Sequence, residues 1–149
     1  MENLLNDEYF MRLALNEAEK ALEKGEIPIG CVIVSNDLVI AKAHNLTETL
    51  QDVTAHAEMQ AFTSAAEYIG AKYLKDCALY VTLEPCIMCL GAAYWTQIPR
   101  IVYGAADKKH TLPIDKKIFL HPKTTLVGGV LEQECTEILS AFFQEKREK

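Results

Sequence analysis

The sequence lacks three features that would place it in a membrane, on a secretory route or among multidomain proteins. Its longest apolar stretch, residues 27–34, is far shorter than the roughly 18 residues that a membrane-spanning helix needs. No segment rich in glycine, serine and proline divides the 149 residues, a length typical of one domain with a full hydrophobic core. Residues 1–8 are acidic, whereas a signal peptide begins with positive charge. We therefore expect one soluble cytoplasmic domain, residues 1–149, with no membrane partner.

The cysteine content does not suit a disulfide framework. The chain has 5 cysteines, an odd number, and two of them form a Cys-x-x-Cys pair at Cys86 and Cys89. The other three lie in apolar segments, such as the one around Cys31, as buried thiols do in a reducing compartment. We expect no disulfide.

Positive charge is in the minority, which argues against indiscriminate binding to DNA or other nucleic acids, because phosphate contacts require lysine and arginine. The formal net charge is −6. Residues 1–107 hold 7 basic and 15 acidic side chains, whereas residues 108–149 hold 8 basic and 6 acidic ones. From charge alone, this basic C-terminal part is most simply an ordinary solvated surface, and a surface that contacts nucleic acid is the alternative.

The most informative residues are a histidine and a glutamate two positions apart, followed by a cysteine pair. His56 and Glu58 come first, and Cys86 and Cys89 follow Pro85. One histidine and two cysteines supply three zinc ligands. Because tetrahedral zinc takes four ligands, the fourth position stays open for water, as it does in catalytic sites. The pKa of such a water falls to roughly 7, and Glu58 is placed to carry protons between the water and a substrate.

Each half of this pattern also has a simpler interpretation. A lone Cys-x-x-Cys can be a redox pair or half of a structural zinc knuckle, and a lone histidine is more often a hydrogen-bonded core residue. A structural zinc site would need a fourth protein ligand. No second Cys-x-x-Cys and no closely spaced histidine pair occurs among the remaining candidates, which are Cys31, Cys77, Cys135, His44, His110 and His121. We therefore expect one catalytic zinc ion per subunit.

Hydrophobic periodicity predicts alternating helices and strands. A helix capped by Asn6 or Asp7 runs until Gly25, and a final helix carries Phe142 and Phe143. Strands are expected at residues 29–34, 38–43, 78–82, 100–103 and 124–127, the first of them buried on both faces. The segment 107–122 is expected to be irregular or briefly helical. The pattern predicts an α/β fold, a three-layer α/β/α sandwich with a five-stranded mixed sheet.

Both parts of the metal motif fall at predicted helix starts. Thr54 is expected to cap a helix that carries His56 and Glu58 in its first turn. Pro85 is typical of a first turn and predicts a helix over residues 86–95. The positive end of a helix dipole favours the thiolate form of cysteine that zinc requires. Two helix starts should therefore face one metal.

With these residues, the chain resembles the bacterial tRNA-specific adenosine deaminases of the cytidine deaminase superfamily over nearly its whole length. The His-x-Glu and Pro-Cys-x-x-Cys pattern is shared with deaminases of free bases and nucleosides. More specific similarity lies at residues 26–30, 43–45, 54–59, 79–86, 103–105 and 129–135 and at Phe142-Phe143. The C-terminal blocks are the most specific part.

The resemblance implies hydrolytic conversion of the wobble adenosine in a tRNA anticodon stem-loop to inosine, with release of ammonia. Zinc hydroxide would attack C6 of adenine, while Glu58 protonates the ring nitrogen and then the departing amine. The resemblance also implies a homodimer, although no stretch of the sequence identifies the contact surface.

The same resemblance implies substrate contacts in three places. Asn45 would hydrogen-bond the purine and its ribose, since its amide offers both donor and acceptor; an Asx turn is the alternative. Asp107 and Lys109 would belong to a loop that contacts the anticodon backbone. Phe143 and Arg147 would grip neighbouring nucleotides by stacking and phosphate pairing. The simpler interpretations are a core aromatic residue and a basic helix end.

Some residues depart from this family pattern. His110 and Thr111 stand where many relatives have glycine, and residues 144–147 are less basic than arginine-rich versions of the last helix. Trp95 and the residues before it look more like guanine deaminases, although an aromatic side chain in the core is the simpler interpretation. A guanine deaminase and a non-catalytic RNA-binding or assembly subunit are therefore the alternative functions. The carboxylate beside the ligands argues against the second, because a purely structural site gains nothing from it.

Overall fold

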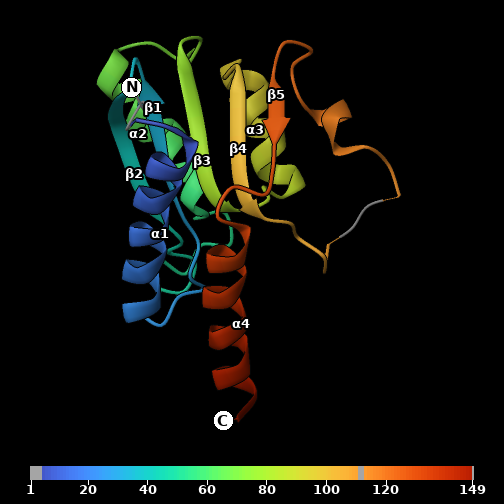
Figure 1. Cartoon of the computed structure of the whole chain (residues 1–149). Coiled ribbons are helices and arrows are strands. Elements are labelled where there is room, and N and C mark those ends of the chain that lie inside the picture. The colour runs from blue at the N-terminus through green and yellow to red at the C-terminus, as the bar shows by residue number, and fades with distance from the viewer. Residues whose placement is uncertain (1–4, 111–112, 149) are drawn as a thin grey trace.

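A computed structural model describes residues 5–110 and 113–148 (Figure 1). The first four residues of the acidic N-terminal segment and Thr111 lie outside the described residues. The helices are α1 (Asp7–Glu23), α2 (Ala57–Ile69), α3 (Ile87–Thr96) and α4 (Glu132–Glu148). The strands are β1 (Gly30–Ser35), β2 (Leu38–His44), β3 (Cys77–Leu83), β4 (Arg100–Ala105) and β5 (Thr125–Val127). A short 3-10 helix, η1 (Lys116–Phe119), lies in the segment predicted to be irregular or briefly helical.

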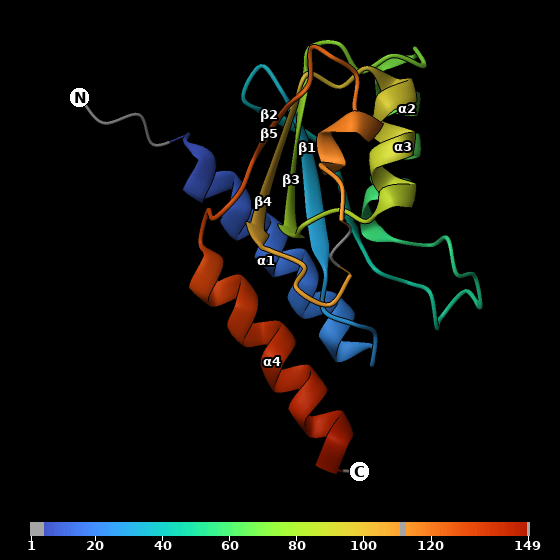
Figure 2. The ribbon, with the colours of Figure 1, turned by 90° about the vertical axis from the view of Figure 1, so that its right-hand side faces the viewer.

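The strands form one mixed sheet in the order β2-β1-β3-β4-β5. β1 pairs antiparallel with β2 and β3, whereas β3, β4 and β5 run parallel to one another. Helices α1 and α4 cover one face of the sheet, and α2 and α3 cover the other (Figure 2). β1 is buried on both faces, as predicted. The predicted three-layer sandwich is therefore confirmed.

Helix α1 lies unusually close to β1. Its apolar side chains recur every three or four residues and face the sheet, at Phe10, Met11, Ala14, Ala18 and Ala21. Gly30 in β1 faces this helix: a Cβ atom there would lie 2.7 Å from the carbonyl carbon of Glu17 and closer still to the backbone of Ala14 and Ala18. The missing side chain at Gly30 is therefore what allows α1 to approach the sheet.

The helices that carry the metal motif begin slightly later than predicted. Thr54 does not cap α2, because its backbone N–H and its hydroxyl both donate to the Asp52 carboxylate, at 2.8 and 2.7 Å. The N-cap residue is His56, one position before the helix. Cys86 is likewise the N-cap of α3, so Pro85 precedes the helix and does not lie in its first turn. His56 and Cys86 thus occupy equivalent positions on neighbouring helices.

Two further expectations concern the membrane and the cysteines. Within residues 5–110 and 113–148, no helix combines the length and the apolar character that a bilayer crossing demands. Cys31, Cys77 and Cys135 are free thiols buried in the interior, as predicted.

Candidate metal centre and active site

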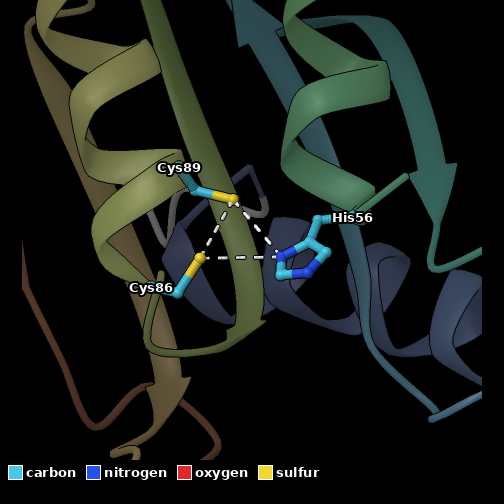
Figure 3. A group of neighbouring side chains, drawn as sticks. All are labelled: His56, Cys86 and Cys89. Atoms are coloured by element: carbon cyan, nitrogen blue, oxygen red, sulfur yellow. Dashed lines mark hydrogen bonds between the residues drawn. The ribbon is translucent and has the colours of Figure 1, made fainter. Parts of the chain in front are cut away.

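Two helix N-termini on the same face of the sheet meet at the metal motif (Figure 3). His56 precedes α2, Cys86 precedes α3, and Cys89 lies in the first turn of α3. Neither His56 nor Cys86 uses its side chain to cap its own helix. All three side chains point toward a common centre instead, as the two predicted helix starts require.

The three ligand atoms form a nearly equilateral triangle. His56 Nδ1 lies 3.6 Å from the Sγ atoms of both Cys86 and Cys89, and the two sulfur atoms are 3.7 Å apart. Tetrahedral zinc with ordinary Zn–N and Zn–S bond lengths gives N–S edges of about 3.6 Å and an S–S edge of about 3.8 Å. The triangle therefore fits a zinc ion. No fourth ligand atom joins the group among the described residues, which leaves the last tetrahedral position to a non-protein ligand.

Hydrogen bonds among the ligands shift their pKa values. The hydrogen bond with Cys89, together with one with His56, lowers the pKa of Cys86 to about 4. The same bond to Cys86, together with burial, raises the pKa of Cys89. The hydrogen bond with Cys86 also raises the pKa of His56. Zinc requires both cysteines as thiolates, and the lowered pKa of Cys86 favours that form.

Glu58 lies in the first turn of α2, beside the ligand triangle. The residue is only 4% exposed. Burial raises the pKa of Glu58. A carboxyl group whose pKa moves toward neutrality exchanges protons readily in both directions, which suits general acid–base catalysis.

Asn45 follows β2 and is almost fully buried, with 4% of its surface exposed. Its Oδ1 accepts a hydrogen bond from the Thr47 N–H at 3.3 Å, so the Asx turn that the sequence left as an alternative is present. The turn uses one of the two lone pairs of Oδ1. The N–H groups of Asn45 and the second lone pair of Oδ1 are what the side chain has to offer a ligand.

Gln60 in α2 is a site residue that the sequence did not reveal. Its Nε2 donates to the carbonyl of His44 at 2.8 Å and to that of Ala55 at 3.2 Å. These bonds hold the end of β2 against the start of α2, so Asn45 lies close to the helix start that carries His56. No motif points to Gln60, because its partners are backbone carbonyls.

The predicted RNA-contacting residues come from two segments that meet. The Asp107 carboxylate accepts the N–H of Lys109 at 3.2 Å, and Lys109 Nζ lies 4.0 Å from the ring centre of Phe143 in α4. Arg147 is four residues further along α4 and so lies on the same side of the helix as Phe143. Of the two neighbouring phenylalanines, Phe142 is the buried core residue, and Phe143 is half-buried.

Glu84 connects this loop to the metal centre and was also missed as an individual residue. Its Oε1 accepts the backbone N–H of Asp107 at 2.9 Å, and its Oε2 pairs with Lys116 Nζ at 3.3 Å. A cavity of about 360 Å³ opens beside these three residues. Since Glu84 lies two positions before Cys86, it ties the start of α3 to the loop that begins at Asp107.

Trp95 does not lie in the core, so that prediction is wrong. The side chain is 76% exposed near the end of α3, and its ring meets the ring of Tyr94 edge-to-face at 5.3 Å. The physical reason is that α3 is apolar around most of its circumference, while the sheet covers only one side of it.

The zinc-binding region of cytidine and deoxycytidylate deaminases matches residues 4–105 of the chain. A tRNA-specific adenosine deaminase of Bacillus subtilis (strain 168) is 47% identical over 152 residues, which cover 98% of this chain and 94% of that protein. A solved structure from a study of A-to-I editing by tRNA:A34 deaminases at the wobble position is 43% identical, with a TM-score of 0.80 over 88% of this chain and 99% of that one. A guanine deaminase structure from Bacillus subtilis is 42% identical, with a TM-score of 0.65, over 68% of this chain and 65% of that one.

The matched region contains all three ligands of the zinc-sized triangle and the buried Glu58. The similarity to the adenosine deaminases covers nearly the whole chain, whereas the similarity to the guanine deaminase covers about two thirds. On these grounds the chain belongs to the cytidine and deoxycytidylate deaminase family, among its tRNA-specific adenosine deaminases.

Proposed function

We propose that the protein is a single zinc-dependent deaminase domain that hydrolyses the wobble adenosine of a tRNA anticodon to inosine and ammonia. The observation that carries this proposal is the similarity to tRNA-specific adenosine deaminases along nearly the whole chain. The open three-ligand site and the buried carboxylate beside it supply the chemistry. We also propose a cytoplasmic location, which a tRNA substrate supports.

The residues of the metal centre divide the chemistry between them. His56, Cys86 and Cys89 would hold one zinc ion per subunit, and the bound ion supplies Lewis acidity that makes water a nucleophile near neutral pH. Glu58 accepts the proton that the attacking water gives up. It passes this proton to the ring nitrogen N1, then takes the second proton from the new C6 hydroxyl group and delivers it to the C6 amino group, so that the C–N bond breaks and ammonia leaves.

Asn45 and the surface beyond it would bind the RNA. The amide N–H groups of Asn45 donate to the purine and its ribose, and its Oδ1, which holds the Thr47 N–H, keeps one lone pair for the same ligand. Phe143 offers a stacking surface, and Lys109 and Arg147 pair with phosphates. Asp107 shapes the loop that carries Lys109. Binding through phosphate contacts weakens as salt concentration rises.

The direct test is inosine formation in an anticodon stem-loop with a wobble adenosine, detected by sequencing as an A-to-G change. We expect conversion by the wild type and none by Glu58→Ala. Glu67→Ala is the matched control, because it removes an exposed glutamate from the same helix α2 and should leave the activity unchanged. A zinc-loaded wild-type protein that leaves the stem-loop unmodified would contradict the proposal.

Guanine deamination is the second candidate, because the Bacillus subtilis guanine deaminase structure is 42% identical to the matched part of the chain. Free guanine is therefore assayed alongside the RNA, at low and high salt. Ammonia release from guanine that is insensitive to salt, with unmodified RNA, would favour this second function over the first.

We also propose that the protein forms a homodimer through the exposed side of α3. This helix contains no charged residue, and its outer side presents Ile87, Tyr94 and Trp95, with 50, 40 and 76% exposure. An exposed apolar patch free of charge is typical of an interface core. Light scattering should report a dimer for the wild type and a zinc-loaded monomer for Trp95→Glu. Leu38→Glu changes a different exposed apolar residue and should stay dimeric; a monomeric wild type would contradict the proposal.

A further inference from the structure

The loop between β2 and α2, residues 45–56, begins with Asn45 and ends with the metal ligand His56. Its first residues form one helical turn, closed by a 2.9 Å hydrogen bond from the Leu50 N–H to the Leu46 carbonyl. The first N–H groups of such a turn have no backbone partner within it. Side chains accept three of them, those of Thr47, Glu48 and Thr49.

Two side chains supply these acceptors. Asn45 Oδ1 accepts the Thr47 N–H at 3.3 Å. The Glu26 carboxylate accepts the other two, with Oε1 taking the Glu48 N–H at 3.0 Å and Oε2 taking the Thr49 N–H at 2.6 Å. Asn45 and Glu26 therefore cap the same turn side by side. Glu26 fixes the position of the turn, and the turn fixes the Asn45 amide through the Thr47 N–H. The orientation of the Asn45 amide therefore depends on Glu26.

Glu26 is itself firmly anchored. It is 0% exposed, and its backbone N–H donates to the Ala21 carbonyl of α1 at 3.0 Å. Burial raises the pKa of Glu26, but the hydrogen bonds from Thr49 and Glu48 outweigh burial and keep the pKa below its usual value. The carboxylate is therefore ionised at neutral pH. A buried charge is costly unless it is fully hydrogen-bonded, so the site strongly favours the closed arrangement of the turn.

The ends of the loop are tied together as well. The Leu46 N–H donates to the Ala55 carbonyl at 3.0 Å, and Gln60 joins the carbonyls of His44 and Ala55. The loop thus has little freedom to absorb a displacement of the turn at residues 46–50. A shift of that turn moves Asn45 relative to the metal centre.

We propose that Glu26 is a positioning residue for substrate binding, which aims the Asn45 amide at the purine through the turn at residues 46–50. This inference rests on the proposed function, because that function gives Asn45 its role. Glu26 does not touch the substrate. Because Asn45 holds the base in the ground state and in the transition state alike, losing its alignment raises KM and leaves kcat nearly unchanged.

The test uses Glu26→Gln in the full-length zinc-loaded protein. The glutamine amide keeps the shape of the side chain but turns an N–H group toward one of the two loop N–H groups. We expect KM for the anticodon stem-loop to rise about tenfold, with kcat within about twofold of the wild type and an unchanged zinc content. Amide hydrogen exchange at Glu48 and Thr49 should become faster, which is a readout independent of catalysis.

The control is Asp7→Asn, which removes a partly buried carboxylate at a distant place in the fold. Asp7 starts α1, and Glu26 follows its far end, so the 17-residue helix separates them by about 25 Å. This variant should lower the melting temperature without changing KM. Its unchanged KM distinguishes loss of alignment from a general loss of stability.

The outcomes separate this inference from the function on which it rests. No activity of the wild type on the stem-loop would overturn the proposed function. An active wild type with an unchanged KM in Glu26→Gln, or a variant that loses zinc and kcat together, would overturn the positioning role. Should Glu26→Gln not fold, Glu26→Asp carries the same test with a KM rise of about threefold. Amide hydrogen exchange at Glu48 and Thr49 that is as fast in the wild type as in an unfolded chain would also overturn the positioning role of Glu26.

Discussion

Replacing Gly30 by alanine should destabilise the protein, because the new methyl group would clash with the backbone of α1. The new Cβ would lie 2.7 Å from the Glu17 carbonyl carbon and closer to the backbone of Ala14 and Ala18, so α1 must move away from β1 by roughly 1 Å. All three neighbours are backbone atoms of one helix and none can rotate aside. Overpacking of this kind costs about 3 kcal/mol. For a chain of this size the melting temperature should fall by about 6–12 °C.

Thermal unfolding of Gly30→Ala provides the measurement, with Ser64→Ala as the control. Ser64 is an exposed residue within α2, so alanine there should leave the melting temperature unchanged or raise it slightly. The zinc content of Gly30→Ala should be that of the wild type, because α1 and the metal centre lie on opposite faces of the sheet. A decrease of less than about 2 °C for Gly30→Ala would refute the close packing of α1, and loss of zinc would refute the independence of the two faces.

Three further predictions concern the active site and pH. Glu58→Gln should retain one zinc ion per chain and lose at least about a hundredfold in kcat, measured with elemental analysis and the stem-loop assay; substantial remaining turnover would remove Glu58 from proton transfer. His56→Ala should lose stoichiometric zinc, and full metal content would refute its role as a ligand. The hydrogen bond from Arg100, together with one from Tyr80, lowers the pKa of Asp7 although burial opposes it. The Asp7 carboxylate therefore stabilises the fold above its unfolded-state pKa of about 4, and that contribution is lost as the pH falls through the lowered value. Acid titration of the free energy of unfolding should be less steep in Asp7→Asn, and parallel titration curves would contradict the assignment.

The fold could be predicted because apolar spacing determines which side of each element is buried. Helix α1 begins at Asp7, where the Asn6 side chain caps it by accepting the Tyr9 N–H at 2.9 Å. The strands expected at residues 29–34 and 38–43 are also present, and a tight hairpin turn with positive φ angles at Asn36 and Asp37 joins them. These features are local, so the sequence around them is enough to predict them.

Features that depend on distant partners could not be predicted in the same way. Thr54 has the side chain of a good helix cap, but the Asp52 carboxylate captures its hydroxyl, and the helix starts two positions later than that cap implies. Trp95 lies in an apolar segment, yet only the layer arrangement determines which side of α3 the sheet leaves uncovered. Glu26 and Gln60 bind backbone groups of a loop, and no residue pattern encodes such partners.

The placement of the metal ligands at two helix N-caps separates the chemistry of the protein from its choice of substrate. His56 and Cys86 sit where regular secondary structure begins, on helices that pack against the sheet. Asn45 and Lys109 lie in loops outside those helices. On the substrate-binding roles that we propose for Asn45 and Lys109, substituting these two loop residues would alter which base or RNA is accepted without disturbing the ligand triangle. This modular construction gives a physical reason why relatives named for adenosine and for guanine deamination both exceed 40% identity to one chain, and it makes the loops the place to engineer new specificity.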